Sequence, residues 1–334
     1  MPRVSILLPC RDAAPHLEAA IASLRGQTFD DFEVLALDDG SRDTTFAELF
    51  TWAQQDHRVR VMQTHGRGLV PALATGLSAA RGEYVARMDA DDIATPTRLE
   101  KQVALLDAEE DLAACGSLIE YFPEEVVQNG ARRYADWING LRDPDTIARD
   151  IFVECPVPHP TLVIRRSVLT AVGGYRDCGW PEDYDLMLRL WAAGYRIGKV
   201  PEVLLRWRES HDRLSRVDPR YAPEAFRRLK VHFLTRTLLA GREGAVVWGA
   251  GPVGKEFARE LRRQGGRVVA FVDLDPRKLG QEIHGAPVID PDEVDRHRGA
   301  LAVAAVGQTG ARAEIRADLA ERGWVEMRDF CAVA

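Results

Sequence analysis

The segment YVARMDADD, residues 84–92, decides the fold that the sequence predicts. Its apolar start follows a turn signal, Arg81-Gly82-Glu83, and predicts a short buried strand. The strand leads directly into three carboxylates, those of Asp89, Asp91 and Asp92. Open α/β sheets bind their ligands at the carboxyl ends of the strands, and carboxylates suit a hard divalent cation. The segment therefore predicts a cation site at the edge of an α/β sheet.

Two other interpretations of these carboxylates compete with the cation site. An EF-hand loop beginning at Asp89 would place Ile93 at a ligand position and Ala94 where the loop requires glycine, so we set it aside. A solvated acidic turn before the next helix is the simpler alternative. That helix is predicted over residues 96–109, because Thr95-Pro96 is typical of an N-cap and a first helical position. The order of the flanking segments favours the cation site.

Composition limits the class of protein. The chain has 334 residues, of which 46% are hydrophobic and 28% charged, as expected of a soluble globular protein with room for two domains. A net charge of −7 argues against nucleic acid as the main partner. No apolar stretch approaches the ~20 residues that span a bilayer. We expect no signal peptide, because the sequence passes from Met1-Pro2-Arg3 straight into a predicted strand. The five cysteines form no C-x-x-C pair. We expect a cytoplasmic protein with reduced thiols.

Strands and helices alternate along the first part of the chain. Short apolar runs predict the strands, and apolar residues at helical spacing predict the helices. Such alternation predicts an α/β fold with a parallel, right-handed, doubly wound sheet. The predicted strands cover residues 4–8, 32–37, 59–62, 84–89 and 112–118. The predicted helices cover residues 14–25, 69–80 and 96–109, and a further helix after the second strand runs to about residue 55.

An ordered series of short motifs accompanies these elements: VSILLP (4–9), QTF (27–29), DFE (31–33), DDGSRD (38–43), ARGEYV (80–85), DADD (89–92), HP (159–160), GGY (173–175) and EDYD (182–185). Over about residues 3–215 the chain resembles the family 2 glycosyltransferases of the GT-A fold. The RMDADD segment, with Pro96, Arg98 and Leu99 after it, is similar to bacterial enzymes that build surface polysaccharides. Ala74 departs from the pattern, since such enzymes often carry Asn there.

The resemblance implies transfer of a hexosyl group from a nucleotide-diphosphate donor, expected to be a UDP-sugar, to a saccharide or lipid-linked acceptor. It also implies that Mg²⁺ or Mn²⁺, held by Asp91 and Asp89, neutralises the departing diphosphate as a Lewis acid. The Pro9–Asp12 loop, with Arg11, matches positions that contact the base and ribose. Arg67 is a further candidate for donor binding.

Asp39 matches another position that contacts the base, and its carboxylate can accept from the N–H of uracil. A plain turn-forming Asp before Gly40 is the alternative. Because the other motifs of the family accompany it, we favour the role of Asp39 in binding the base.

The acceptor hydroxyl must lose a proton, and the resemblance assigns the general base to Asp183. Carboxylates in the first turn of a helix are stabilised as anions, so Asp183 would be ionised at neutral pH. Glu182 and Asp185 are its rivals. One base and a single displacement imply inversion at the anomeric carbon. Trp180 beside the base either stacks on an acceptor sugar or belongs to the core.

A strand over residues 203–208 is followed by a segment that folds back over the donor in the family. Arg208 could then face the diphosphate, and His211 could face the metal, although a lone His is often structural. The Gln-x-x-Arg-Trp signature of processive members is absent before Trp207. Transfer of one sugar per encounter is therefore expected.

We place the transferase domain at residues 1–218 and a helical linker at residues 219–241. The linker contains a basic helix over residues 223–239, which either contacts a membrane surface near a lipid-linked acceptor or packs between two domains. The second alternative is favoured, so at most peripheral contact with the inner face of the membrane is expected. A homo-oligomer is also compatible with the sequence.

A second, smaller domain is predicted at residues 242–334. Gly249, Gly251 and Gly254 follow a predicted strand and open a helix, and Asp273 ends the next strand, where it could bind a ribose hydroxyl. The stretch resembles the small Rossmann-like modules attached to sugar-modifying enzymes. It would bind a dinucleotide, another nucleotide or a nucleotide sugar, or serve only in regulation or assembly.

Two other activities are alternatives to sugar transfer. A nucleotidyltransferase of related fold would carry a Gly-rich loop after its first strand, but Pro9-Cys10-Arg11-Asp12 contains no glycine. An NAD(P)-binding oxidoreductase, or a regulatory scaffold, would act through the C-terminal domain and leave the N-terminal carboxylates unexplained. Cys155 and His159 could form half of a metal site, but no second pair accompanies them.

Overall fold

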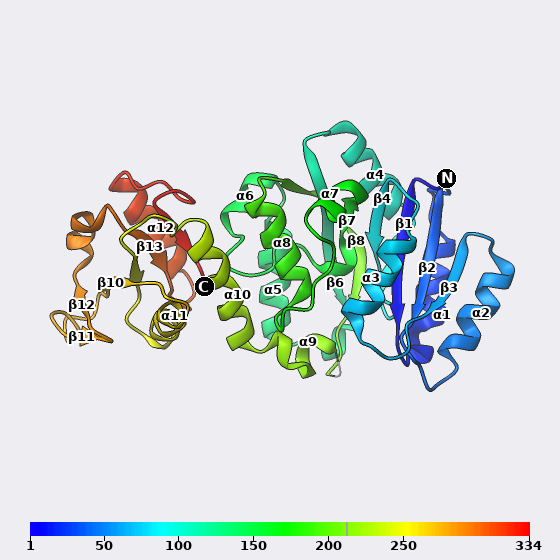
Figure 1. Cartoon of the computed structure of the whole chain (residues 1–334), viewed down its shortest axis with the longest axis horizontal. Coiled ribbons are helices and arrows are strands. Elements are labelled where there is room, and N and C mark those ends of the chain that lie inside the picture. Colours follow the sequence, from blue (N-terminus) through cyan, green and yellow to red (C-terminus); the bar gives the residue numbers. More distant parts are fainter. Residues whose placement is uncertain (212) are drawn as a thin grey trace. The chain divides into compact units, whose positions relative to one another are not determined.

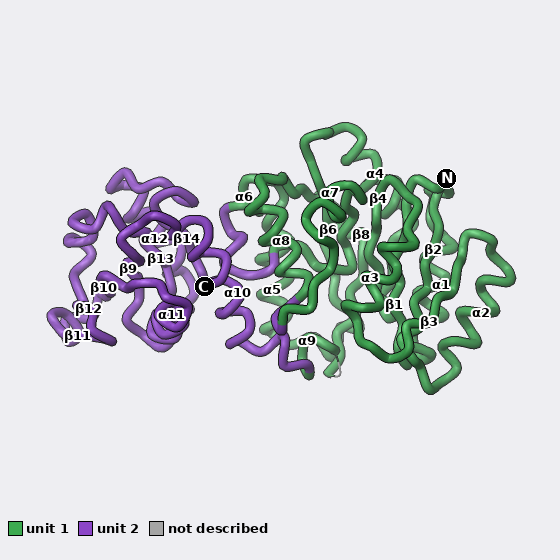
Figure 2. Tube along the Cα trace, in the orientation of Figure 1, with its two compact units in different colours: residues 1–148, 156–178, 182–217 green, residues 149–155, 179–181, 218–334 purple. Residues whose placement is uncertain are grey.

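A computed structural model describes residues 1–211 and 213–334, and the chain separates into two compact units (Figures 1 and 2). Unit 1 is formed by residues 1–148, 156–178 and 182–217, and unit 2 by residues 149–155, 179–181 and 218–334. The region expected to be a linker, residues 219–241, thus falls within unit 2.

Unit 1 contains an eight-stranded sheet in the order β3-β2-β1-β4-β7-β6-β8-β5. Its strands are β1 (Val4–Cys10), β2 (Phe32–Asp38), β3 (Val59–Gln63), β4 (Tyr84–Arg87), β5 (Ile93–Ala94), β6 (Leu112–Phe122), β7 (Val163–Arg165) and β8 (Arg196–Arg208). Its helices are α1 (Ala14–Arg25), α2 (Thr45–Gln55), α3 (Leu69–Ala79), α4 (Arg98–Ala108), α5 (Asn129–Gly140), α6 (Pro144–Arg149), α7 (Arg166–Ala171), α8 (Glu182–Ala192) and α9 (Leu214–Val217).

The first four strands form the parallel half of this sheet, as the sequence predicts. β1 pairs in parallel with β2 and with β4, and β2 pairs in parallel with β3. Every residue of β2 and of β4 is buried, which is expected for parallel strands whose two faces are both covered. The α/β fold class is confirmed, and the carboxyl ends of β1, β2 and β4 meet at one edge.

The second half of the sheet is mixed, so the prediction of a wholly parallel sheet was wrong there. β7 runs antiparallel to both β4 and β6, and β5 runs antiparallel to β8. β7 has three residues and β5 has two, which is too short for a periodic pattern to show in the sequence.

The start of α4 also differs from the sequence prediction. The helix begins at Arg98, and Thr97 rather than Thr95 is its N-cap residue. The reason is the pairing of β5 with β8, which continues through a hydrogen bond from Thr95 N to Leu204 O of 2.9 Å. This pairing keeps the chain extended through Thr95 and brings the end of β8 beside the loop after β4.

A buried polar anchor fixes the turn that precedes β4. The Ser5 hydroxyl donates to Glu33 Oε1 at 2.8 Å and accepts from Gly82 N at 2.8 Å. Arg81 N also donates to Glu33, at 2.9 Å. An added Cβ on Gly82 would lie 2.6 Å from Ser5 N, so only glycine lets the turn approach β1 this closely. The anchor thereby sets where β4, and the carboxylates after it, enter the sheet.

Unit 2 contains a six-stranded sheet in the order β11-β12-β10-β9-β13-β14, parallel except for β11. Its strands are β9 (Ala245–Trp248), β10 (Val268–Val272), β11 (Glu282–Ile283), β12 (Ala286–Ile289), β13 (Leu301–Ala304) and β14 (Phe330–Ala332). Its helices are α10 (Pro223–Arg236), α11 (Pro252–Arg263) and α12 (Ala311–Glu321). The basic helix expected in the linker is α10.

Buried Lys230 of α10 explains why a short piece of preceding chain belongs to unit 2. Its ammonium donates to Val153 O at 2.6 Å and to Val333 O at 3.0 Å.

Among the helices of the described residues, none combines the length and the apolar character that crossing a membrane requires.

We expect Gly82→Ala to destabilise unit 1, because the new methyl group would overlap backbone atoms of β1 and β4 that cannot move aside. Overpacking of this kind costs about 1–3 kcal/mol. Urea denaturation followed by circular dichroism should show a lower midpoint. The matched control is Gly140→Ala, at an exposed position where the added methyl meets open space. Equal midpoints for the two variants would contradict the role assigned to the anchor.

Candidate active site

Three carboxylates gather on the loop after β4. Asp89, Asp91 and Asp92 each offer an oxygen, and these oxygens lie within 4.8 Å of one another. Asp92 is buried, and its Oδ1 accepts from Arg208 N at 2.8 Å. Its Oδ2 has no hydrogen-bond partner among the described residues. A buried carboxylate oxygen without a partner in an all-oxygen cluster fits a hard divalent cation.

Crowding of like charges changes the protonation of this cluster. Burial, and then the charge of Asp89, raise the pKa of Asp91 from 3.8 to about 6. Burial, together with the charges of Asp89 and Asp91, also raises the pKa of Asp92 well above its ordinary value. The ionised cluster is thus unfavourable in the absence of a compensating cation.

A buried arginine lies beneath Asp89. Arg87 is 2% exposed, and its Nη2 donates to Asp89 Oδ1 at 2.5 Å, while its Nη1 donates to the carbonyl of Met88. The neighbouring charge of Asp89 helps to raise the pKa of Arg87 against the effect of burial. Arg87 therefore remains a cation, and it fixes one rotamer of Asp89.

A second buried arginine, Arg98 of α4, supports the backbone of the same loop. Its Nη2 donates to Arg87 O at 2.7 Å, and its Nε donates to Gln102 Oε1 at 3.0 Å. Gln102 in turn donates to Thr161 O at 2.7 Å. These bonds connect α4 and the segment before β7 to the carboxylate loop, so the loop is held from below on two sides.

The end of β8 contacts the cluster from another side through Arg208, whose role toward the diphosphate stays a prediction. The Arg208 side chain donates from Nε to Asp91 O at 2.8 Å and lies over the Phe122 ring, 4.4 Å from its centroid. Arg208 thus lies beside the proposed cation site, where its charge also acts on Asp91.

Arg213, which sequence reasoning did not single out, is a third positive charge near the carboxylates, after Arg87 and Arg208. Its guanidinium lies 4.2 Å from the centroid of the Trp207 ring and 3.3 Å from Glu209 Oε2. Its charge lowers the pKa of Asp91 and of Asp92, although burial outweighs it. A basic residue five positions after Arg208 was the only signal in the sequence.

Asp39, the predicted base contact, is buried at the carboxyl end of β2. Its Oδ1 accepts from the Thr64 hydroxyl at 2.7 Å and from Arg67 N at 3.0 Å, and its Oδ2 accepts from Gly68 N at 2.8 Å. A carboxylate offers about four acceptor positions. Three are occupied by the residue 64–68 loop, so Asp39 organises that loop and keeps about one position for a ligand.

The other predicted donor contacts lie around Asp39. Pro9 is near the end of β1, and exposed Arg11 follows, with its Nη1 3.7 Å from Asp39 Oδ2. The Arg67 side chain is also exposed, and its Nε donates to Thr64 O at 3.2 Å. Both cations are thus on the edge formed by β1 and β2.

A buried polar group links the cluster to the first turn of α8. His159 Nδ1 lies 3.5 Å from Glu182 Oε1, and the rings of His159 and Tyr175 are 5.5 Å apart. Burial lowers the pKa of His159, so its imidazole is neutral at pH 7. The charge of Glu182 also acts on Arg87, the partner of Asp89. The start of α8 is therefore close to the carboxylate cluster.

The three carboxylates at the start of α8 have different surroundings. Glu182 is buried against His159, and Asp185 accepts from Arg189 Nε at 2.7 Å. Asp183 is half-buried, and its Oδ1 accepts from Tyr184 N at 2.7 Å. Glu182 and Asp185 are buried, so Asp183 is the most exposed of the three carboxylates.

Two further residues of the sequence analysis are not shown to join the carboxylate cluster. His211 is exposed, and the group of possible metal ligands among the described residues consists of Asp89, Asp91 and Asp92 without it. Its role as a metal ligand stays a prediction. Trp180 belongs to unit 2, where its ring lies 5.0 Å from that of His232 and 5.7 Å from the Arg228 guanidinium.

The predicted residues of the second domain come together in unit 2. Gly249, Gly251 and Asp273 line a cavity at the carboxyl ends of its strands, and Gly254 lies in the first turn of α11.

Known proteins share this fold and these sequence features. The sequence profile of the family described as "Glycosyl transferase family 2" matches residues 5–173. The glycosyltransferase named EpsE of Bacillus subtilis is 31% identical over 220 residues, which cover 64% of this chain and 76% of that protein. The amylovoran biosynthesis glycosyltransferase AmsE of Erwinia amylovora is 29% identical over 214 residues, which cover 64% and 78%.

Two solved structures are similar in fold. Residues 1–349 of S. aureus TarS, in complex with UDP-GlcNAc, superpose with a TM-score of 0.58 at 19% identity, covering 79% of this chain and 72% of that one. The mannosyltransferase PcManGT of Pyrobaculum calidifontis, in complex with GDP-Man and Mn²⁺, superposes with a TM-score of 0.51 at 23% identity, covering 70% and 62%.

We expect Asp91→Asn to stabilise the metal-free protein at pH 7, because it removes one of three crowded negative charges. Since the pKa of Asp91 is raised on folding, the folded chain keeps a proton that the unfolded chain loses between about pH 4 and pH 6. Wild-type stability should therefore rise as pH falls through 6, and the advantage of the variant should shrink.

Thermal melts in EDTA at pH 7 and pH 5 measure this difference. Raising the pKa of Asp91 from 3.8 to about 6 changes the free energy of unfolding by at most about 3 kcal/mol, or several degrees in melting temperature. Asp145→Asn, at an exposed first-turn carboxylate of α6, is the control for the substitution itself. An Asp91→Asn variant that melts at or below the wild-type temperature at pH 7 would refute the crowding argument.

Proposed function

The chain belongs to glycosyl transferase family 2, and we propose that it moves a sugar from a UDP-sugar donor to a hydroxyl of a saccharide or lipid-linked acceptor, with a divalent cation and with inversion. The observation that carries this proposal is the cluster of Asp89, Asp91 and Asp92 at the carboxyl edge of the sheet. The name of AmsE, with its part in amylovoran biosynthesis, supports a place in surface polysaccharide synthesis.

Asp89 and Asp91 would hold the cation, which we propose to be Mg²⁺ or Mn²⁺. Mn²⁺ with GDP-Man in the PcManGT structure supports this choice, as does a site composed of oxygen ligands. When bound, the ion neutralises the charge that the nucleotide acquires as the sugar–phosphate bond breaks. Arg87 orients Asp89 for this task, and Arg208 adds a positive charge beside the site.

Asp39 and the loop that it organises would bind the base of the donor. The acceptor position left on Asp39 matches the single N–H of uracil, whereas the Watson–Crick edge of guanine presents two donor groups. UDP-GlcNAc in the TarS complex supports the same class of donor. Pro9 and Arg11 would border the base and the ribose, and Arg67 would face the donor from the opposite loop.

Asp183 would take the proton from the acceptor hydroxyl. Its place in the first turn of α8 favours the ionised form that a base requires. One displacement at the anomeric carbon then inverts its configuration. The missing Gln-x-x-Arg-Trp signature favours transfer of one sugar per encounter.

Unit 2 supports a second proposal, that it is a Rossmann-like module. Numbered within the unit, its parallel strands β12-β10-β9-β13-β14 run in the order 3-2-1-4-5, which is that of the Rossmann fold. An oxidoreductase acting through this unit would leave the carboxylate cluster of unit 1 without a role, so we regard the transferase as the catalyst.

We expect the protein to release the nucleotide from a UDP-sugar only when Mg²⁺ or Mn²⁺ is present, and Asp91→Ala to abolish this reaction. Loss of a metal ligand should reduce the rate by at least about a hundredfold, since the ligand shell and its charge both change. A panel of nucleotide sugars, assayed for nucleotide release with and without EDTA, measures it. Glu110→Ala, at an exposed carboxylate of unit 1, is the control. Full activity in EDTA would rule out the metal-dependent reaction.

We expect Asp183→Asn to bind the donor normally and to lose turnover. Removing a general base lowers kcat by about 10²–10⁴-fold, whereas the affinity for UDP should change little. Calorimetric titration with UDP and Mn²⁺, combined with a transfer assay, separates the two effects. Asp145→Asn again controls for the substitution. Normal turnover of Asp183→Asn would exclude Asp183 as the base and leave the assignment of the donor site intact.

A further inference from the structure

Unit 2 has a cavity of about 690 Å³ whose occupant the transferase reaction does not explain. It lies at the carboxyl ends of β9, β10 and β13, and α12 forms one wall. This volume falls within the range of about 300–1,000 Å³ typical of ligand sites. We propose that this cavity binds a nucleoside diphosphate, either free or as part of a dinucleotide or a nucleotide sugar.

Of the three glycines in the turn after β9, two are required by packing and one is not. A Cβ on Gly254 would lie 1.8 Å from Gly249 O, and one on Gly249 would lie 2.9 Å from Ala305 O. Packing alone therefore requires these two glycines. A Cβ on Gly251 would meet nothing within 4 Å, although Gly251 lines the cavity. The fold does not need a glycine at 251, and its absent side chain leaves room for a bound group.

The bound group at this turn is expected to be an anion. Gly251 is the N-cap residue of α11, and no side chain in the described part of the chain caps this helix end. Pro252 has no N–H, so the first free backbone donors are Val253 and Gly254. Uncapped donors at the start of a 12-residue helix, facing a cavity of this size, suit a diphosphate.

The loop after β10 offers complementary groups for a ribose. Asp273 Oδ1 accepts from Asp275 N at 2.9 Å, and Oδ2 accepts from Ala250 N at 2.9 Å and from Lys278 Nζ at 2.8 Å. One acceptor position remains on the carboxylate, and the ammonium keeps donors beyond its bond to Asp273. Both side chains line the cavity. Adjacent ribose hydroxyls, each a donor and an acceptor, match such a pair.

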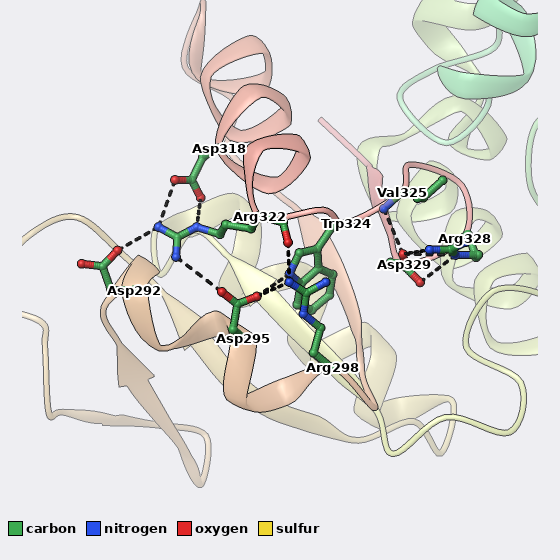
Figure 3. Close-up of polar contacts among 9 residues, drawn as sticks. All are labelled: Asp292, Asp295, Arg298, Asp318, Arg322, Trp324, Val325, Arg328 and Asp329. Atoms are coloured by element: carbon green, nitrogen blue, oxygen red, sulfur yellow. Dashed lines mark hydrogen bonds and ion pairs between the residues drawn. The ribbon is translucent and has the colours of Figure 1, made fainter.

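The opposite wall is held in place by a network around Arg322, shown in Figure 3. Arg322 Nε donates to Asp318 Oδ2 of α12 at 2.9 Å, and Nη2 donates to Asp292 Oδ1 at 2.8 Å. Asp295 also accepts from Trp324 Nε1, at 2.9 Å. The network connects α12 to the 3₁₀ segment Pro291–His297, and both contribute residues to the cavity. The network thus connects two walls of the cavity to one another.

This site is independent of the proposed transferase site, because all residues that carry it belong to unit 2. Its test is calorimetric titration of the full chain in EDTA with ADP, NAD⁺ and UDP as separate probes. Omitting metal keeps the proposed donor site of unit 1 from binding UDP through its cation.

We expect at least one probe to bind, with one site per chain. Gly251→Leu should weaken that binding by at least about tenfold, because its side chain fills the space for the phosphates. The backbone at Gly251 has φ −91° and ψ −171°, which any residue adopts, so the substitution should not disturb folding. Gly140→Leu, at an exposed glycine of α5 with open space around it, is the matched control.

Lys278→Ala provides a second variant, at a partly exposed side chain, and should also weaken binding. Binding of ADP and NAD⁺ would identify a dinucleotide as the source, and binding of UDP alone, lost in Gly251→Leu, would identify a nucleotide sugar. The proposal is overturned if none of the three probes binds at millimolar concentration, or if Gly251→Leu binds them as the wild type does. Neither result bears on the transferase assay, which uses unit 1.

Discussion

Repulsion among three carboxylates is the constraint on which the structure of unit 1 depends. Asp89, Asp91 and Asp92 follow the strand β4 so closely that their oxygens come within 4.8 Å of one another, and two of the three have raised pKa values. Such a cluster is unfavourable by itself. Three arginines compensate for its negative charge. Buried Arg87 donates to Asp89, Arg208 donates to the Asp91 carbonyl, and Arg213 lies over the Trp207 ring. A protein keeps such a cluster where function requires the charge.

The mixed half of the sheet serves this arrangement. A wholly parallel sheet would supply the carboxyl ends of β1, β2 and β4, but it would not return a chain to the cluster from the other side. The antiparallel pairing of β5 with β8 does so, because it brings Arg208 N to Asp92 and Arg208 Nε to the carbonyl of Asp91. Long pairing of β6 with β8 then places Phe122 under the Arg208 guanidinium.

Sequence reasoning found the parts of this site that local pattern encodes. Alternating apolar runs gave the parallel strands, and strand ends gave Asp39, Asp89 and Asp91. The family resemblance drew attention to Asp183 and Arg208. Sequence reasoning missed features that depend on contacts formed only in the folded chain. Arg87 lies in an apolar strand, and nothing in the local sequence shows that it pairs with Asp89. Likewise, β7 and β5 are too short to be periodic, and they are defined by their partners alone.

In unit 2, as in unit 1, the candidate binding residues lie at the carboxyl ends of parallel strands, but glycines and an Asp–Lys pair take the place of the three carboxylates. A turn after its first strand, the end of the next strand and a helix beyond the switch in strand order surround one cavity. The sequence identified Gly249, Gly251, Gly254 and Asp273, but not that Lys278 pairs with Asp273, nor that Gly251 alone among the three glycines is free of packing demands.

The central claim, that the loop after β4 holds a divalent cation, is tested most directly by anomalous diffraction at the manganese edge. Crystals soaked with Mn²⁺ and UDP should show a peak in direct contact with carboxylate oxygens of Asp89 or Asp91, on the side that faces the bound diphosphate. Bound UDP with no anomalous peak at these carboxylates, under saturating Mn²⁺, would contradict the account.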